Sequence, residues 1–222
     1  MAHSKQMNIL CWGDSITWGF NSETGTRYDY KDRVTTHIEN VIIKAFEEKC
    51  ITDTKISIIN AGFCGRTTMF DDELYPEIGF NGLKHLPIFM DTFSPIHLVV
   101  IMLGTNDSKS YLNKTQNQIA LGISRLVYLA KSKGAKVLIV TPPVVEPEFF
   151  NDNTKLCFEN PNMNGLDEKY KMVGSVSDSV CVNASDFGVR VCRNDGVHLD
   201  KENNKLLGEG IGETILRFYI EK

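Results

Sequence analysis

Five short apolar runs, spaced along the whole chain, constrain the fold more than any other feature of the sequence. Each is rich in isoleucine, valine or leucine and lacks the polar–apolar alternation of a half-exposed strand. Strands of a parallel sheet have this composition because helices cover both of their faces. The runs are Met7–Trp12, Ile56–Ile59, Leu98–Leu103, Val137–Val140 and Val180–Val182.

Amphipathic stretches lie between these runs. Residues 34–45 and 119–130 place apolar side chains on one helical face, and 207–218 does so despite glycines at 208, 210 and 212. Alternation of strands and helices with right-handed crossovers predicts a three-layer α/β/α fold around a five-stranded parallel sheet of the flavodoxin-like kind. No repeat or low-complexity linker interrupts the pattern, so we expect a single domain over residues 1–222.

Composition narrows the class of protein. The 222 residues are 42% hydrophobic and carry a net charge of −4, as in a globular protein with no evident affinity for nucleic acid or anionic membranes. Because no signal peptide or run of about 18 apolar residues is present, we expect a cytoplasmic protein with no membrane insertion.

The sequence lacks the common signatures of cofactor and metal sites. Its six cysteines form no C-x-x-C pair, and we expect reduced, structural thiols. Neither nucleotide-binding glycine motifs nor an H-E-x-x-H zinc motif occurs. We therefore expect no cofactor and no metal.

Polar residues follow four of the predicted strands. The first strand leads into Gly13-Asp14-Ser15, the second into residues 60–68, the third into residues 104–107, and the loop after the fifth contains Asp195 and His198. Parallel strands share a carboxyl edge, so we expect these residues to gather there.

Such a gathering suits acyl transfer. A serine hydroxyl is a weak nucleophile until a histidine takes its proton and a carboxylate orients that histidine. Ser15 alone would more often be a helix cap, but His198 and Asp195 supply both helpers. Asp186 and Asp200 compete with Asp195 for the acid role.

The four segments together resemble the Ser–Gly–Asn–His hydrolases, also called GDSL esterases and lipases. The resemblance implies the SGNH hydrolase fold, with Ser15 as nucleophile, His198 as base and Asp195 as acid. It also implies an oxyanion hole made by the backbone N–H groups of Ser15 and Gly65 and the side chain of Asn106. Asp107 is then expected to form a turn or cap, and Asp14 to brace the turn before the nucleophile.

Within that family, the stretches at 13–19, 65–68 and 101–107 resemble the arylesterase/acyltransferase branch, which includes a mycobacterial acyltransferase that also performs perhydrolysis. Trp18, Phe20 and Cys64 are candidates for the substrate pocket, with core packing as the competing interpretation of the aromatic residues. We expect Arg66 to form a structural ion pair. Three polar segments, 21–31, 68–82 and 142–164, are expected to build the pocket walls.

The leading hypothesis is a serine esterase or acyltransferase that acts on short-chain, acetyl-like esters through an acyl-enzyme. A thioesterase or lysophospholipase for longer acyl chains is the alternative enzyme. A non-catalytic carbohydrate-binding domain of the same fold is the alternative from another class. The resemblance also predicts a small-molecule ester as partner, and a homo-oligomer.

Overall fold

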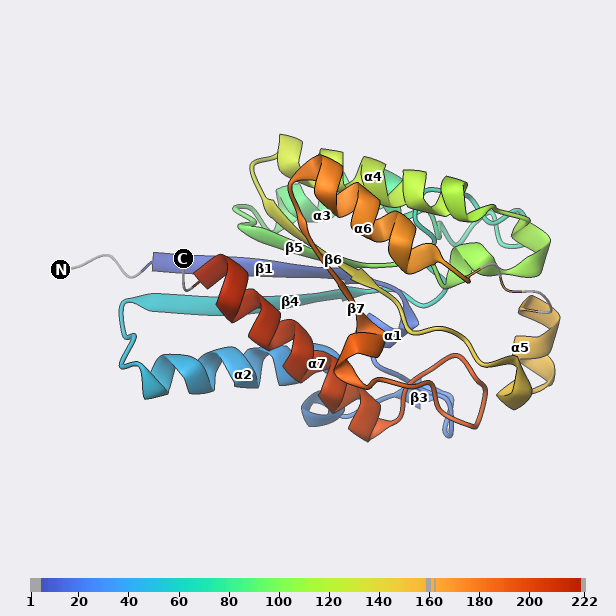
Figure 1. Cartoon of the computed structure of the whole chain (residues 1–222), viewed down its shortest axis with the longest axis horizontal. Coiled ribbons are helices and arrows are strands. Elements are labelled where there is room, and N and C mark those ends of the chain that lie inside the picture. Colours follow the sequence, from blue (N-terminus) through green and yellow to red (C-terminus); the bar gives the residue numbers. More distant parts are fainter. Residues whose placement is uncertain (1–4, 159–160, 162, 221–222) are drawn as a thin grey trace.

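A five-stranded parallel sheet forms the centre of the molecule (Figure 1). The computed structural model describes residues 5–158, 161 and 163–220. The strand order is β4-β1-β5-β6-β7, which in chain order is 2-1-3-4-5, the flavodoxin-like arrangement. The predicted fold class is therefore confirmed. The strands are β1 (Lys5–Gly13), β4 (Thr54–Gly62), β5 (Leu98–Met102), β6 (Lys136–Thr141) and β7 (Val180–Asn183).

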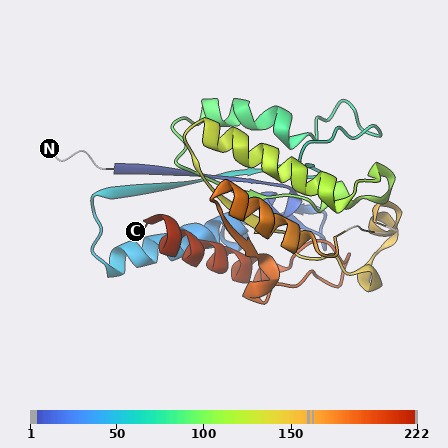
Figure 2. The same cartoon turned by 45° about the horizontal axis from the view of Figure 1, so that its top comes forward.

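Helices cover both faces of the sheet (Figures 1 and 2). The helices α3 (Gly82–Thr92), α4 (Gln116–Ser132) and α6 (Leu166–Ser177) cover one face. The helices α2 (Val34–Glu48) and α7 (Lys201–Ile215) cover the other, and α7 continues into a short π-helical turn over Leu216–Ile220. Two short helices, α1 (Ser15–Trp18) and α5 (Asp152–Cys157), and the hairpin β2 (Phe20–Asn21) with β3 (Thr26–Arg27) complete the elements used below.

The buried strand residues explain why the apolar runs do not alternate. In β1, Leu10 and Trp12 pack under α3, α4 and α6, whereas Ile9 and Cys11 pack over α2 and α7. The fully buried β5 behaves in the same way. Both faces of the central strands are therefore covered by helices, as parallel sheets require.

The glycines of α7 have a packing role that the sequence pattern did not predict. A Cβ on Gly208 would lie 2.5 Å from the Cβ of His37 in α2, and a Cβ on Gly212 would lie 2.9 Å from that of Val41. These glycines weaken helix propensity, but they allow α7 to lie close against α2.

Two of the longer helices were not predicted from the sequence. In α3, Pro87 lies inside the helix and breaks the expected pattern. In α6, buried Leu166, Tyr170 and Gly174 form a narrow stripe on an otherwise polar helix. Their apolar faces are small, so periodicity alone did not identify them.

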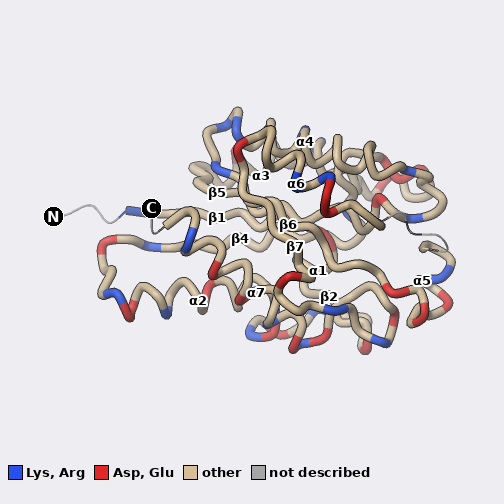
Figure 3. Tube along the Cα trace, in the orientation of Figure 1, with Lys and Arg blue, Asp and Glu red and all other residues tan. Residues whose placement is uncertain are grey.

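The two ends of the strands differ in character. The start of β1 and the C-terminal turn Leu216–Ile220 lie at the amino edge of the sheet, while α1, α5 and the hairpin lie toward the carboxyl edge (Figure 1). Figure 3 shows that basic and acidic residues are scattered over the described trace. No helix in the described part of the chain is long and apolar enough to cross a membrane.

Candidate active site

Ser15 lies at the start of α1, directly after β1. Asp14 is the N-cap of this helix, and its carboxylate accepts a hydrogen bond of 3.0 Å from the N–H of Ile16. Asp14 therefore braces the turn, as expected from the sequence. Burial raises the pKa of Asp14 to about 6, although Ile16 N–H, His198 and Arg66 favour its charged form.

The second strand fixes α1 in place. A Cβ on Gly62 would lie 2.1 Å from the backbone nitrogen of Trp18, so only glycine allows α1 this close to the end of β4. Asn60, also in β4, donates from Nδ2 to the carbonyl of Thr17 at 2.8 Å. The backbone around Ser15 is thus held by β1 and β4 together.

Ser15, His198 and Asp195 form one chain of hydrogen bonds. The Nε2 atom of His198 lies 2.9 Å from Ser15 Oγ, and its Nδ1 atom lies 2.6 Å from Asp195 Oδ2. Ser15 is 8% exposed and Asp195 3% exposed. Residues from opposite ends of the sequence therefore meet at the carboxyl edge of the sheet.

The environment of Asp195 determines how the proton of His198 is placed. Burial alone would raise the pKa of Asp195, but the hydrogen bond and charge of His198 and the N–H groups of His198 and Val197 lower it to about 2. An ionised carboxylate can only accept, so Nδ1 of the neutral imidazole carries the hydrogen. Nε2 then presents its lone pair to the hydroxyl of Ser15.

The loop after β4, which carries Gly65, is bound to the end of β1 just before Ser15. The N–H of Phe63 donates to Gly13 O at 3.1 Å, and Arg66 Nη1 donates to the same oxygen at 2.8 Å. Gly65 has φ +85°, and a Cβ there would lie 2.5 Å from the Phe80 ring. Among the described residues, no group accepts a hydrogen bond from the N–H of Ser15 or of Gly65.

Asn106 joins this loop from the end of β5. It is 7% exposed, and its Nδ2 donates to the carbonyl of Arg66 at 3.2 Å. An amide nitrogen carries two hydrogens, so one can hold the side chain in place while the other binds a second acceptor.

Asp107 lies in the 3₁₀ turn Asn106–Ser108, as expected, but its carboxylate binds a residue of another loop. Its two carboxylate oxygens accept from the N–H of Thr68 at 2.9 and 3.0 Å, and Oδ1 also accepts from Thr68 Oγ1 at 2.5 Å. Asp107 is fully buried, and desolvation raises its pKa to about 6. It therefore ties the Asn106 loop to the Gly65 loop.

Arg66 also departs from expectation. Instead of an ion pair, its guanidinium lies 3.6 Å from the centroid of the Trp12 ring and donates to the carbonyls of Gly13 and Ala61. It is 4% exposed, and burial lowers its pKa to about 10. The predicted ion pair was wrong, because Arg66 satisfies carbonyls at the carboxyl ends of β1 and β4.

The three candidate pocket residues lie around the site in different ways. The Phe20 ring packs on the His198 imidazole, with centroids 4.5 Å apart. The ring centroids of Trp18 and Phe20 lie 6.5 Å apart. The guanidinium of Arg27 lies over the Trp18 ring, 5.0 Å from its centroid. Cys64 is half-buried, and burial, followed by the charge of Asp14, raises its pKa to about 11.

Sequence reasoning missed Cys192 as a neighbour of the site. Its thiol donates to Asp195 Oδ1 at 3.5 Å, and its backbone N–H donates to His198 O at 2.7 Å. The only sequence signal was its position three residues before Asp195. Asp186, the competing acid, lies in a 3₁₀ turn over Ala184–Phe187 instead, and Asp200 caps α7.

The segment between β6 and α6 packs against the loop of Asp195 and His198. Val145, Phe158 and Met163 form an apolar cluster with Val197, and Glu146 N–H donates to Gly196 O at 2.8 Å. The expectation that residues 142–164 form a wall of the site fits these contacts, except that residues 159, 160 and 162 lie outside the described part.

A hollow of about 680 Å³ lies between this segment and the Asn106 loop. Trp18, Phe20 and Cys64 do not belong to its described lining. The lining is mixed, with two lysines, two serines and two asparagines beside five apolar residues: Ser108, Lys109, Ser110, Asn113, Lys114, Val144, Val145, Pro147, Pro161, Met163 and Asn164.

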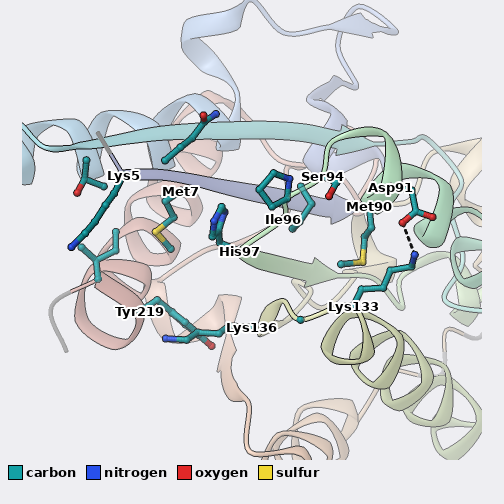
Figure 4. A pocket seen from close by; sticks show the side chains of 15 residues that line it. Lys5, Met7, Met90, Asp91, Ser94, Ile96, His97, Lys133, Lys136 and Tyr219 are labelled. Atoms are coloured by element: carbon teal, nitrogen blue, oxygen red, sulfur yellow. Dashed lines mark hydrogen bonds and ion pairs between the residues drawn. The ribbon is translucent and has the colours of Figure 1, made fainter. Parts of the chain in front are cut away.

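A second hollow, of about 660 Å³, lies at the opposite edge of the sheet (Figure 4). Met7, Met90 and Ile96 line it together with His97 and Tyr219. These residues come from the start of β1, the end of α3, the loop before β5 and the C-terminal turn. This hollow is therefore remote from Ser15, and the chemistry described above does not involve it.

No group of three or more His, Cys, Asp or Glu side chains among the described residues could hold a metal ion. The groups gathered at the carboxyl edge are instead a hydroxyl, an imidazole, a carboxylate and amide donors. Such a set can move protons and bind a developing negative charge.

Solved structures of other proteins share the fold of this chain. The M. smegmatis aryl esterase is 31% identical, with a TM-score of 0.84 over 95% of this chain and 99% of that one. A carbohydrate acetylesterase from Sinorhizobium meliloti is 29% identical, with a TM-score of 0.85 over 96% and 100%. A carbohydrate acetylesterase family member from the same organism is 30% identical, with a TM-score of 0.83 over 95% and 98%.

A search of the curated proteins gives no match. Residues 11–202 match the GDSL-like lipase/acylhydrolase family, and this range runs from β1 past His198. The resemblance inferred from the sequence is confirmed. The chain belongs to the GDSL-like lipase/acylhydrolase family.

Proposed function

We propose that the protein is a serine esterase that cleaves short-chain esters through an acyl-enzyme on Ser15. The observation that supports this most is the hydrogen-bond chain from Ser15 Oγ to His198 Nε2 and from His198 Nδ1 to Asp195, at 2.9 and 2.6 Å. Three groups so aligned can take a proton from the hydroxyl and stabilise the imidazolium that results.

The reaction would proceed in two halves. Ser15 Oγ attacks the ester carbonyl while His198 accepts its proton, and the imidazolium then protonates the leaving alcohol. Water then attacks the acyl-enzyme while His198 takes its proton, and the imidazolium returns that proton to Ser15 Oγ as the acid leaves. The oxyanion of each tetrahedral intermediate would accept from Ser15 N–H, Gly65 N–H and Asn106 Nδ2.

One observation favours a short acyl group over a long one. The names of the solved neighbours include carbohydrate acetylesterases and an aryl esterase. Acetylated carbohydrates and aryl acetates are therefore the first substrates to test.

The test is a p-nitrophenyl ester series from acetate to palmitate, together with acetate release from peracetylated sugars. We expect acetate to be the preferred chain, and Ser15→Ala to lose activity by about 10³-fold or more. Ser124→Ala, an exposed serine on α4, is the matched control and should retain wild-type rates. Activity retained in Ser15→Ala would exclude the proposal, and preference for palmitate would favour the thioesterase or lysophospholipase alternative.

The remaining proposals are tested by a variation of this assay and by separate measurements of sugar binding and of molecular mass. An alcohol added as acceptor should yield a new ester if the acyl-enzyme also supports transfer. Binding of acetylated sugars with no hydrolysis or transfer would instead support the alternative of a non-catalytic carbohydrate-binding domain. Light scattering of the purified chain would test the proposed homo-oligomer.

A further inference from the structure

The hairpin that follows α1 and the residue just after it contact the loop carrying Asp195 and His198 at three points. The Phe20 ring lies on the His198 imidazole, and the hydroxyl of Ser22 lies 3.1 Å from the Cys192 thiol. Just beyond the hairpin, Tyr28 donates from its hydroxyl to Leu199 O at 3.2 Å. These contacts join segments about 170 residues apart in the sequence.

The direction of the hydrogen bonds around Cys192 follows from the carboxylate. Asp195 Oδ1 can only accept, so the single thiol hydrogen of Cys192 goes to Asp195. The hydroxyl of Ser22 must then donate to the sulfur. A chain therefore runs from Ser22 through Cys192 to Asp195 and on to His198.

Oδ1 of Asp195 is consequently surrounded by donors. It accepts from the N–H groups of Val197 and His198, each at 3.0 Å, and from the Cys192 thiol. Burial raises the pKa of Cys192, which keeps the thiol protonated and able to donate. The remaining oxygen, Oδ2, is left for His198 Nδ1.

We propose that Ser22 and Cys192 are positioning residues, through which the hairpin over Phe20–Arg27 orients Asp195 and tunes its attraction for the protonated His198. This inference rests on the proposed esterase function. A thiol donor withdraws negative charge from the carboxylate, so its loss would strengthen the hold of Asp195 on the imidazolium. The Phe20 ring packs on the imidazole of His198 and would limit its movement.

Other ionisable groups face this network and must stay unchanged in the test. Asp14, in the turn before α1, interacts electrostatically with His198. Tyr28 interacts with Cys192, and the charges that act on Tyr28 are those of Glu23, Asp32 and Asp200. Two arginines lie nearby, Arg27 over Trp18 and Arg193 over Phe149.

The experiment compares the pH dependence of kcat/KM for p-nitrophenyl acetate in wild type, Cys192→Ala, Cys192→Ser and Ser22→Ala. In Cys192→Ala we expect the acid limb to move to higher pH by roughly 0.3 to 1 unit, as loss of one hydrogen bond would produce. Cys192→Ser restores a donor and should bring the limb back toward wild type. Ser22→Ala should shift it in the same direction as Cys192→Ala, by less.

A double variant tests whether the two residues act in one chain. Ser22→Ala should add no further shift in the Cys192→Ala background. Cys181→Ala is the matched control, since Cys181 lies on β7 and packs at the edge of the core. That variant should lower thermal stability without moving the acid limb.

The outcomes separate the two proposals. If Ser15→Ala is inactive but the acid limb of the pH profile is unshifted in Cys192→Ala and Ser22→Ala, only the positioning role is overturned. An active Ser15→Ala would overturn the esterase function on which it rests. If Cys192→Ala fails to fold, an unshifted limb in Ser22→Ala would still contradict the inference.

Discussion

At the scale of single residues, Asn106 supplies the one side-chain donor of the proposed oxyanion site. Asn106→Ala should lower kcat for p-nitrophenyl acetate by about 100- to 1,000-fold, because one donor to the developing charge is lost. The only described partner of its side chain is Arg66 O, so the melting temperature should fall by no more than a few degrees. Asn117→Ala, an exposed residue of α4, is the control. A loss of less than about threefold would remove Asn106 from the proposed site.

Asp107, the next residue in the sequence, should make the free energy of unfolding depend on pH. Its pKa is raised to about 6 by burial, so the folded protein binds this proton more tightly than the unfolded chain does. Its contribution to the free energy of unfolding is therefore largest below about pH 4 and falls as the pH rises through 6. Asp107→Asn also places an N–H₂ group against the N–H and hydroxyl of Thr68.

We therefore expect Asp107→Asn to be destabilised at every pH, with a cost that is smaller at pH 7 than at pH 4. Urea denaturation of both proteins at several pH values between 4 and 7 measures this. A cost that does not change with pH would show that the buried carboxyl titrates normally. A cost that grows toward pH 7 would contradict the sign of the shift.

These residue roles show what a sequence can predict about a site. Ser15, Asp195 and His198 were proposed because each follows a buried strand or the loop after one, and parallel topology brings such positions together. The roles of Gly65 and Asn106 were implied only by the resemblance to the GDSL hydrolases. The contacts of Cys192 and of Phe20 depend on how two irregular segments fold over each other. No spacing rule connects residues so far apart in sequence, so their packing appeared only in the structure.

At the scale of elements, the loop between β4 and α3 holds Gly65 in a left-handed backbone conformation, and this conformation sets the direction of its N–H group. Gly65→Ala should destabilise the protein by about 1–3 kcal/mol and lower kcat, because its Cβ would meet the Phe80 ring at 2.5 Å. Phe80→Leu in the same chain should recover part of this loss by removing ring atoms. Melting temperatures and kcat of the single and double variants measure both effects.

If the double variant recovered nothing, backbone strain at φ +85° would be the whole cost and the Phe80 contact would be irrelevant. Phe80→Leu alone is the necessary control. Phe80 also packs near Phe63 and Tyr75, so some loss of stability is expected from that change by itself.

Elements with strong periodicity were the ones predicted. All five strands were placed within two or three residues of their ends, and α2 and α4 contain the apolar faces expected of them. The helices α3 and α6 were missed because a proline and a narrow apolar stripe hide their period. The glycines of α7 suggested a weak helix, yet they serve its close contact with α2.

At the scale of the whole molecule, the proposed site depends on both ends of the chain. Ser15 follows β1 in the middle of the sheet, while His198 lies 183 residues later, after the edge strand β7. An edge strand with one neighbour could detach first, but α7 packs closely on α2 and both helices share a core cluster with β1 and β5. The His198 loop is therefore attached to an element that folds with the centre of the sheet.

We expect esterase activity and far-UV circular dichroism to be lost in one transition in urea, with the same midpoint. Gly208→Ala should lower that midpoint for both signals by a similar amount, because its Cβ would lie 2.5 Å from the Cβ of His37 and disturb the contact between α7 and α2. Glu213→Ala, an exposed change in the same helix, should leave the midpoint nearly unchanged. Activity lost at clearly lower urea than the helical signal would mean that β7 and its loop open on their own. In that case the geometry at Ser15 would rest on a separately unfolding edge rather than on the whole sheet.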